Sequence, residues 1–150
     1  MPTGTTSDPL QHSFSAPPFE SAKVLDAMRL GVISCAPDTS LREVGRIMAT
    51  YRIHSVIVSE PGSIDPVGVI ADVDLVAAAA RSPEADARAI ARSEPLTVTP
   101  EDSLPHAAQL MAEHGLSHLV VVQPHSRHAV GVLSALDVAG VLAWGDIASR

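Results

Sequence analysis

The sequence predicts an α+β fold made of two pseudo-symmetric repeats packed sheet to sheet, each with the element order strand, helix, strand, strand, helix (β-α-β-β-α). The first observation is a seven-residue sequence motif that occurs twice, as GVIADVD at 68–74 and as GVLSALD at 131–137. We call this motif the closing phrase of each repeat. The second is that the same shift of 63 residues aligns the rest of both copies without a gap. The third is that apolar spacing within each copy alternates between helical and strand-like periods.

The repeat divides the 150 residues into three regions. Residues 1–22 are rich in proline, serine and threonine, and we expect them to form a flexible N-terminal arm. The first repeat spans 23–82 and the second spans 86–145. The sequence RSPEAD at their junction has the proline, serine and charges of a connector.

Each repeat begins with a short helical segment and a brief strand. The helical segments are KVLDAM and DARAIA, and the strands lie at 32–35 and 96–98. A longer helix follows, and in the first copy Ser40 and Glu43 have the spacing of a capping box at its start. The apolar residues of this helix share one face: Leu41, Val44, Ile47, Met48 and Tyr51. In the second copy, Pro105 is compatible with the first helical turn.

Two apolar strands and a closing helix complete each repeat. The strands are predicted at 56–58, 67–70, 119–122 and 130–133. The closing helices are predicted at 72–80 and 135–144, and their segments 74–80 and 138–144 are apolar on nearly every side, which predicts burial on more than one face. A repeat of about 60 residues has a marginal core by itself. We therefore expect the two copies to pack together and two chains to form a homodimer.

Charge and cysteine content exclude several classes of function. The net charge of −7 argues against a nucleic acid partner, because affinity for a phosphate backbone comes from cations. The single cysteine, Cys35, cannot form an internal disulfide and is expected to be buried in a strand. No apolar run approaches the roughly 18 residues needed to span a bilayer. A cytosolic protein without a membrane partner is the expectation.

Catalysis and metal binding find no support in the motifs. The chain has no G-x-S-x-G nucleophile elbow, no paired cysteine ligands and no GxxxxGK[ST] phosphate loop. Among the histidines, His114 and His118 have helical spacing, and His125 and His128 share a loop. His118 falls at the start of an expected strand, so the first pair need not share a face. We therefore predict neither an enzyme nor a metal site.

The repeated motifs resemble the cystathionine-beta-synthase (CBS) domain family, specifically a stand-alone tandem pair, also called a Bateman module. The resemblance covers about 23–145 and rests on three features. These are the helix starts PDTSL and PEDSL, the stretch MAEHGLSHLVVV, and the closing phrase with its serine or alanine and its aspartate. The resemblance implies a non-catalytic sensor that requires no cofactor and binds an adenosine-containing ligand, such as AMP, ADP, ATP or S-adenosylmethionine. The ligand would lie in clefts between the repeats, and an unknown partner protein would respond to it.

The resemblance also implies roles for the closing phrase. Its aspartate would accept hydrogen bonds from the ribose hydroxyls, and its serine, at a helix N-terminus, would contact phosphate. Ser134 and Asp137 also have the spacing of a capping box, which is an alternative explanation for the serine. In the first copy Ala71 takes the place of the serine, whereas Asp74 remains. The two clefts are therefore expected to be unequal.

By resemblance, each cleft takes residues from both repeats. The better cleft would be formed by Ile33, Ile53, Ser117, His118, Val132, Ser134 and Asp137. The weaker cleft would be formed by His54, Val69, Asp74, Leu96 and Leu116. One departure from the family touches both copies, because Ile57 and Val120 stand where the family often has proline.

Charge narrows the choice of ligand. The second-copy motif segments contain no lysine or arginine, and Arg127 is the nearest in sequence. A triphosphate would lack cations there, so AMP or S-adenosylmethionine is favoured over ATP. The alternative is a purely structural homodimerisation or interaction protein. Its clefts would stay empty or be filled by its own arm, with Phe14 or Phe19 as the plug.

Overall fold

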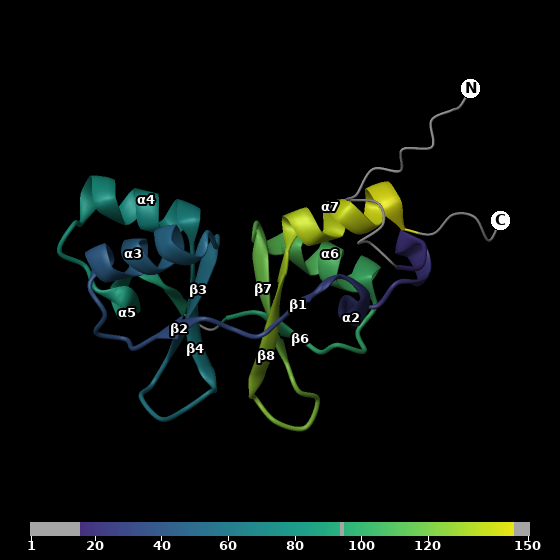
Figure 1. The fold of residues 1–150 in the computed structure, drawn as a ribbon, viewed down its shortest axis with the longest axis horizontal. Coiled ribbons are helices and arrows are strands. Elements are labelled where there is room, and N and C mark those ends of the chain that lie inside the picture. Colours follow the sequence, from purple (N-terminus) through teal and green to yellow (C-terminus); the bar gives the residue numbers. More distant parts are fainter. Residues whose placement is uncertain (1–15, 94, 146–150) are drawn as a thin grey trace.

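The computed structural model describes residues 16–93 and 95–145. Figure 1 shows two halves side by side, each with a small sheet that faces the middle of the molecule. The helices of each half lie on the side of its sheet that is turned away from the other half (Figure 1). The expected α+β fold with two repeats is confirmed.

The elements repeat in the structure as they do in the sequence. The first repeat contains β2 (Ser34–Cys35), α3 (Leu41–Tyr51), β3 (Ser55–Ser59), β4 (Pro66–Ala71) and α4 (Asp72–Arg81). The second contains β6 (Thr97–Val98), α6 (Leu104–His114), β7 (His118–Val122), β8 (Ala129–Ser134) and α7 (Ala135–Trp144). Every bound in the second set lies 63 residues after its counterpart in the first.

Equivalent residues begin and end the two longer helices. The Ser40 hydroxyl accepts a hydrogen bond from the Glu43 amide at 3.1 Å, and Ser103 caps α6 through the His106 amide at the same distance. Both helices end on a residue in the left-handed region, Arg52 with φ of 53° and Gly115 with φ of 62°. Glycine adopts this conformation at little cost, whereas an arginine there is uncommon.

Two short strands cross between the repeats, and the sequence analysis did not predict them. β1 (Arg29–Leu30) pairs with β8, which gives the strand order β1-β8-β7-β6. β5 (Arg92–Ser93) pairs with β4, which gives the order β2-β3-β4-β5. The preceding helices exchange in the same way: α2 (Val24–Ala27) packs against α6 and α7, and α5 (Ala87–Ile90) packs against α3 and α4. Each sheet is therefore completed by a segment of the other repeat.

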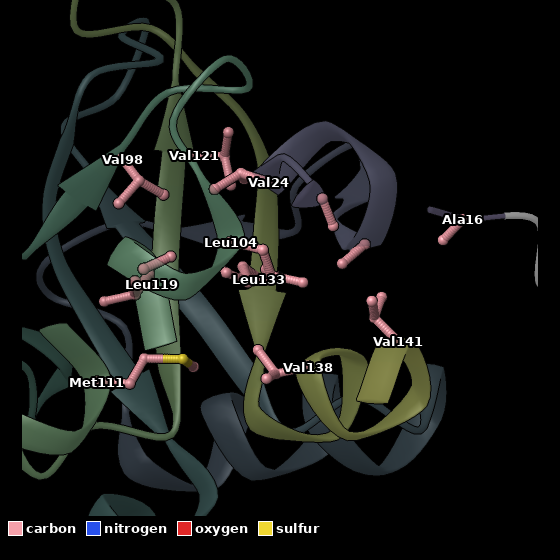
Figure 2. Close-up of a cluster of buried hydrophobic side chains, with 13 residues drawn as sticks. Ala16, Val24, Val98, Leu104, Met111, Leu119, Val121, Leu133, Val138 and Val141 are labelled. Atoms are coloured by element: carbon pink, nitrogen blue, oxygen red, sulfur yellow. The ribbon is translucent and has the colours of Figure 1, made fainter. Parts of the chain in front are cut away.

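Three apolar clusters stabilise this arrangement. One lies under the helices of the first repeat, and a larger one lies under those of the second. Figure 2 shows the larger cluster, in which Leu104, Leu119 and Leu133 meet at the centre and Val24 reaches in from α2. The third cluster joins the sheets through Ile57, Val69, Val120, Val122 and Ala129. This third cluster is the sheet-to-sheet packing that the repeat predicted.

Residues 16–22 belong to the folded part of the chain, although we expected them to form part of a flexible arm. Ala16 and Ala22 are buried in the larger cluster, and Phe19, in the short helix η1 (Phe19–Ser21), packs against it. The carbonyl oxygen of Ala22 accepts a hydrogen bond from the Leu104 amide at 2.8 Å. These contacts attach the segment to α6. Phe14 lies outside the described residues.

Candidate ligand-binding site

A cavity of about 620 Å³ lies at the seam between the repeats. Its walls come from the β1–β2 segment, from the turn between α3 and β3, and from the starts of β7 and α7. The lining includes all seven residues expected for the better cleft: Ile33, Ile53, Ser117, His118, Val132, Ser134 and Asp137. Its volume lies within the range of about 300–1,000 Å³ that is usual for small-molecule sites.

Asp137 is held at the N-terminus of α7. Its Oδ2 accepts a hydrogen bond from the Ser134 amide at 2.9 Å, and the Ser134 hydroxyl accepts one from the Asp137 amide at 3.1 Å. This is a reciprocal capping box, so the capping role that the spacing suggested is present. The serine oxygen acts as the acceptor in that bond and keeps its own hydrogen as a donor. Capping and contact with a ligand are therefore compatible.

Two arginines line the same cavity, and sequence reasoning missed both. Arg29 comes from β1, and Arg52 comes from the left-handed end of α3. The Nε atom of Arg29 lies 3.3 Å from Oδ1 of Asp137. The expectation that this site lacks cations is thus wrong, because it rested on the second-copy segments, whereas both arginines come from the first copy. The position of Arg52, directly before Ile53, was the available signal in the sequence.

Two histidines lie on the cavity wall near carboxylates. Nδ1 of His54 is 3.0 Å from Oδ2 of Asp72, and Nδ1 of His118 is 2.9 Å from the Ser117 hydroxyl oxygen. Burial lowers the pKa of His118 below its usual value, because the charged ring would lose its water shell. Nearby carboxylates, foremost Asp72, oppose this shift in pKa. The lowered pKa favours the neutral form of the His118 ring.

A smaller cavity of about 340 Å³ borders Asp74. Three of the five residues expected for the weaker cleft line it: Val69, Asp74 and Leu116. The other two lie elsewhere, because His54 lines the larger cavity and Leu96 packs against the core of the second repeat. Ser117 and His118 line both cavities, so the two spaces share a wall. Oδ2 of Asp74 accepts a hydrogen bond from the Ala71 amide at 2.9 Å.

Other expected features can be placed within the described residues. Phe19 packs against the second core and is not among the residues that line either cavity. No group of three or more His, Cys, Asp or Glu side chains in residues 16–93 and 95–145 is arranged to hold a metal ion. None of the described helices combines the length and the apolar character required to cross a membrane.

The architecture defines a class of protein, a tandem α+β repeat module with its cavities at the seam between the repeats. The CBS domain model matches residues 24–81 and 87–143, and the protein belongs to the CBS domain family. This confirms the resemblance found in the repeated motifs. The chain is also similar to the CBS domain-containing protein YhcV of Bacillus subtilis (strain 168), with 25% identity over 130 residues. That alignment covers 85% of this chain and 84% of the relative.

Solved structures show the same architecture. The CBS domain protein PAE2072 from Pyrobaculum aerophilum, complexed with AMP, is 28% identical, with a TM-score of 0.71. The alignment covers 81% of this chain and 98% of that one. The CBS domain pair of protein MJ0100, in complex with 5'-methylthioadenosine and S-adenosyl-L-methionine, has a TM-score of 0.75 over 81% of this chain and 95% of that one. At 21% identity, this second likeness shows the fold alone.

Proposed function

We propose that the protein is a non-catalytic regulatory module that binds an adenosine-containing ligand in the larger cavity. One observation carries the proposal: a buried carboxylate, a helix N-terminus, apolar residues and two arginine residues line one cavity of about 620 Å³. The complex of PAE2072 with AMP supports it, because that protein is 28% identical and has the same fold. The expected cytosolic location stays a prediction.

Each part of an adenosine nucleotide has a complementary part of the wall. Ile33, Ile53 and Val132 offer apolar surface to the adenine ring. Asp137 can accept hydrogen bonds from the vicinal hydroxyls of the ribose. Ser134, with Ser117 and His118 beside it, lies where a helix N-terminus offers a partial positive charge to phosphate.

The two arginines favour AMP within this class. A monophosphate carries about two negative charges, which two guanidinium groups can neutralise. S-adenosylmethionine carries a sulfonium cation, which these groups would repel, so it ranks second. A triphosphate brings more negative charge than the cavity wall can neutralise, and the net charge of −7 adds a repulsive field. We therefore place AMP ahead of both.

Thermal shift and calorimetry with adenosine, AMP, ADP, ATP and S-adenosylmethionine test the proposal. A ligand at 100 times its dissociation constant should stabilise the protein by about 2.7 kcal/mol. Asp137→Asn should weaken AMP binding by about 1.5–3 kcal/mol, because it removes charge-assisted hydrogen bonds to ribose. Asp74→Asn, the same change one repeat earlier, is the matched control and should leave binding in the larger cavity intact. No response to any of these ligands would favour the purely structural alternative.

We also propose that the chain forms a homodimer through α4 and α7. Val73 and Val76 on α4 and Leu136 and Leu142 on α7 are more than half exposed, although all four are apolar. Both helices run along the upper side of the molecule in Figure 1, so one partner surface could cover them together. Apolar side chains exposed on one side of a molecule are typical of an interaction site.

The oligomeric state tests this interface. Val76→Glu and Leu142→Glu place a charge in the apolar surface, and neither residue lines a cavity. Light scattering coupled to size exclusion should show a dimer for the parent protein and a monomer for the double variant. A parent protein that is monomeric at all concentrations would contradict the interface.

A further inference from the structure

The carboxylate that the proposed ribose contact requires already has a partner on each oxygen. Oδ2 of Asp137 accepts from the Ser134 amide at 2.9 Å, and Oδ1 lies 3.3 Å from Nε of Arg29. The Asp137 side chain is only 9% exposed, whereas the Arg29 side chain is 74% exposed. The backbone contact is built into the helix start, but the guanidinium contact is made by a long side chain at the surface. Oδ1 is therefore the oxygen that can change partner.

The backbone of Arg29 is fixed even though its side chain is exposed. β1 pairs with β8 with Arg29 opposite Val132, and the Gly31 amide donates to the Val130 carbonyl oxygen at 2.9 Å. Gly131 allows this close approach, because a Cβ atom there would collide with the Arg29 carbonyl oxygen. The guanidinium can therefore move within the cavity without any movement of the strand that carries it.

We propose that Arg29 is a displaceable counter-ion of Asp137 and the residue that selects for a phosphate on the ligand. The inference rests on the proposed function and deepens it. The ribose hydroxyls take Oδ1 of Asp137, and the released guanidinium pairs with the phosphate of the same ligand. A phosphate accepts two parallel hydrogen bonds from one guanidinium, so the arginine exchanges one anion for another.

For a nucleoside without phosphate, the ion pair lost on binding would not be replaced by a new one. Its ribose would still have to displace Arg29 from Asp137, but the guanidinium would gain no new anion. The Arg29–Asp137 ion pair thus weakens the binding of adenosine, whereas its effect on the binding of AMP is neutral or favourable. An ordinary cation near the phosphate would strengthen AMP binding without opposing adenosine. The two roles can be separated by measuring both ligands.

The experiment is calorimetric titration of the full chain with AMP and with adenosine. The variants are Arg29→Gln and, as the matched control, Arg52→Gln, which removes the second cavity arginine. Arg29→Gln should weaken AMP binding about tenfold or more. It should also strengthen adenosine binding by about threefold, the size expected when a partly exposed ion pair no longer competes. Arg52→Gln should weaken AMP binding and leave adenosine binding unchanged.

The outcomes separate this inference from the function on which it rests. If the parent protein binds AMP but Arg29→Gln leaves adenosine affinity unchanged or lower, displacement of Arg29 is refuted while the proposed function stands. If the parent protein binds neither AMP nor adenosine, both are refuted. Arg29→Lys keeps the charge but not the two parallel bonds, and its AMP affinity should fall between those of the parent and Arg29→Gln. Thermal unfolding of each variant checks that it is folded.

Discussion

The two repeats have the same elements at the same spacing but build cavities of different size and chemistry. The cavity beside Asp137 measures about 620 Å³, and the one beside Asp74 about 340 Å³. In both repeats the aspartate accepts a hydrogen bond of 2.9 Å from the amide three residues before it. Only the second repeat adds a serine hydroxyl that returns a bond. The acid is therefore positioned by backbone geometry, and the residue at the helix cap can differ without moving it.

The cores of the repeats differ as well. The second repeat buries more apolar residues, because residues 16–22 and α2 pack onto it. Leu104 is fully buried there, whereas Leu41, at the equivalent position, is only partly buried. The same residue type at the same point of the repeat thus has a different energetic role.

The largest expected change in the free energy of unfolding comes from replacing these two leucines by alanine, one at a time. Leu104→Ala should lower the free energy of unfolding by about 2–5 kcal/mol, because it leaves a cavity in a packed core. Leu41→Ala should cost clearly less, since part of that side chain already contacts water. Urea denaturation of both variants measures the difference. Equal losses would contradict the assignment of the larger core to the second repeat.

A glycine pair tests the exchanged strand. Gly131→Ala should cost about 1–3 kcal/mol, because the added methyl group would push β1 away from β8. Gly45→Ala lies within α3, where the nearest atom to the new methyl group would be Cδ2 of Leu75 at 3.8 Å. This control should stabilise the protein by about 0.5–1 kcal/mol, since alanine favours the helix. If Gly131→Ala leaves the free energy of unfolding unchanged, the pairing of β1 with β8 does not depend on the close approach of the two backbones at Gly131.

Exchanging the cap residues sharpens the contrast between the closing helices. Ser134→Ala removes the hydroxyl that accepts from the Asp137 amide and should cost about 1 kcal/mol. Ala71→Ser supplies the same group in the first repeat and should recover a similar amount there. Thermal unfolding of the two variants gives the comparison. If Ala71→Ser brings no gain, the two helix starts are not equivalent.

The smallest expected effect is on the pH dependence of stability and concerns His118, which lies in the wall that the two cavities share. Burial lowers the pKa of folded His118, so below pH 6.5 the unfolded chain takes up a proton that the folded protein does not. The His118 contribution to stability is therefore lost as the pH falls from the unfolded pKa toward the folded one. His118→Gln should flatten this part of the stability profile, measured by urea titrations between pH 7.5 and 5. A profile with the same slope in both proteins would show that His118 does not contribute.

Much of the fold could be predicted because the same pattern of apolar residues occurs in both repeats. The longer helices and central strands lie within one or two residues of their predicted positions, since their apolar periods are clear in both copies. The seven residues named for the better cleft line one cavity, and their role as ligand contacts stays a prediction. This grouping followed from the resemblance, because no local pattern links Ile33 to Asp137.

The exchanged strands could not be predicted in the same way. β1 and β5 have two residues each, too few for an apolar period to appear, and their partners lie in the other repeat. Arg29 was missed for this reason: it reaches Asp137 only because β1 crosses to β8. Leu96, which lies 63 residues after Ile33, was expected in the weaker cleft by resemblance, but it packs against the second core instead. Symmetry of sequence therefore predicts elements better than it predicts side-chain environments.

Because β1 and β5 pair with strands of the other repeat, neither repeat has a complete sheet as a separate fragment. A fragment carrying one repeat would leave a sheet with an exposed edge, a surface that readily recruits a strand from another molecule. The halves should therefore unfold in a single cooperative transition. When the connector between them is strained or shortened, two molecules can trade halves and form an intertwined, domain-swapped pair.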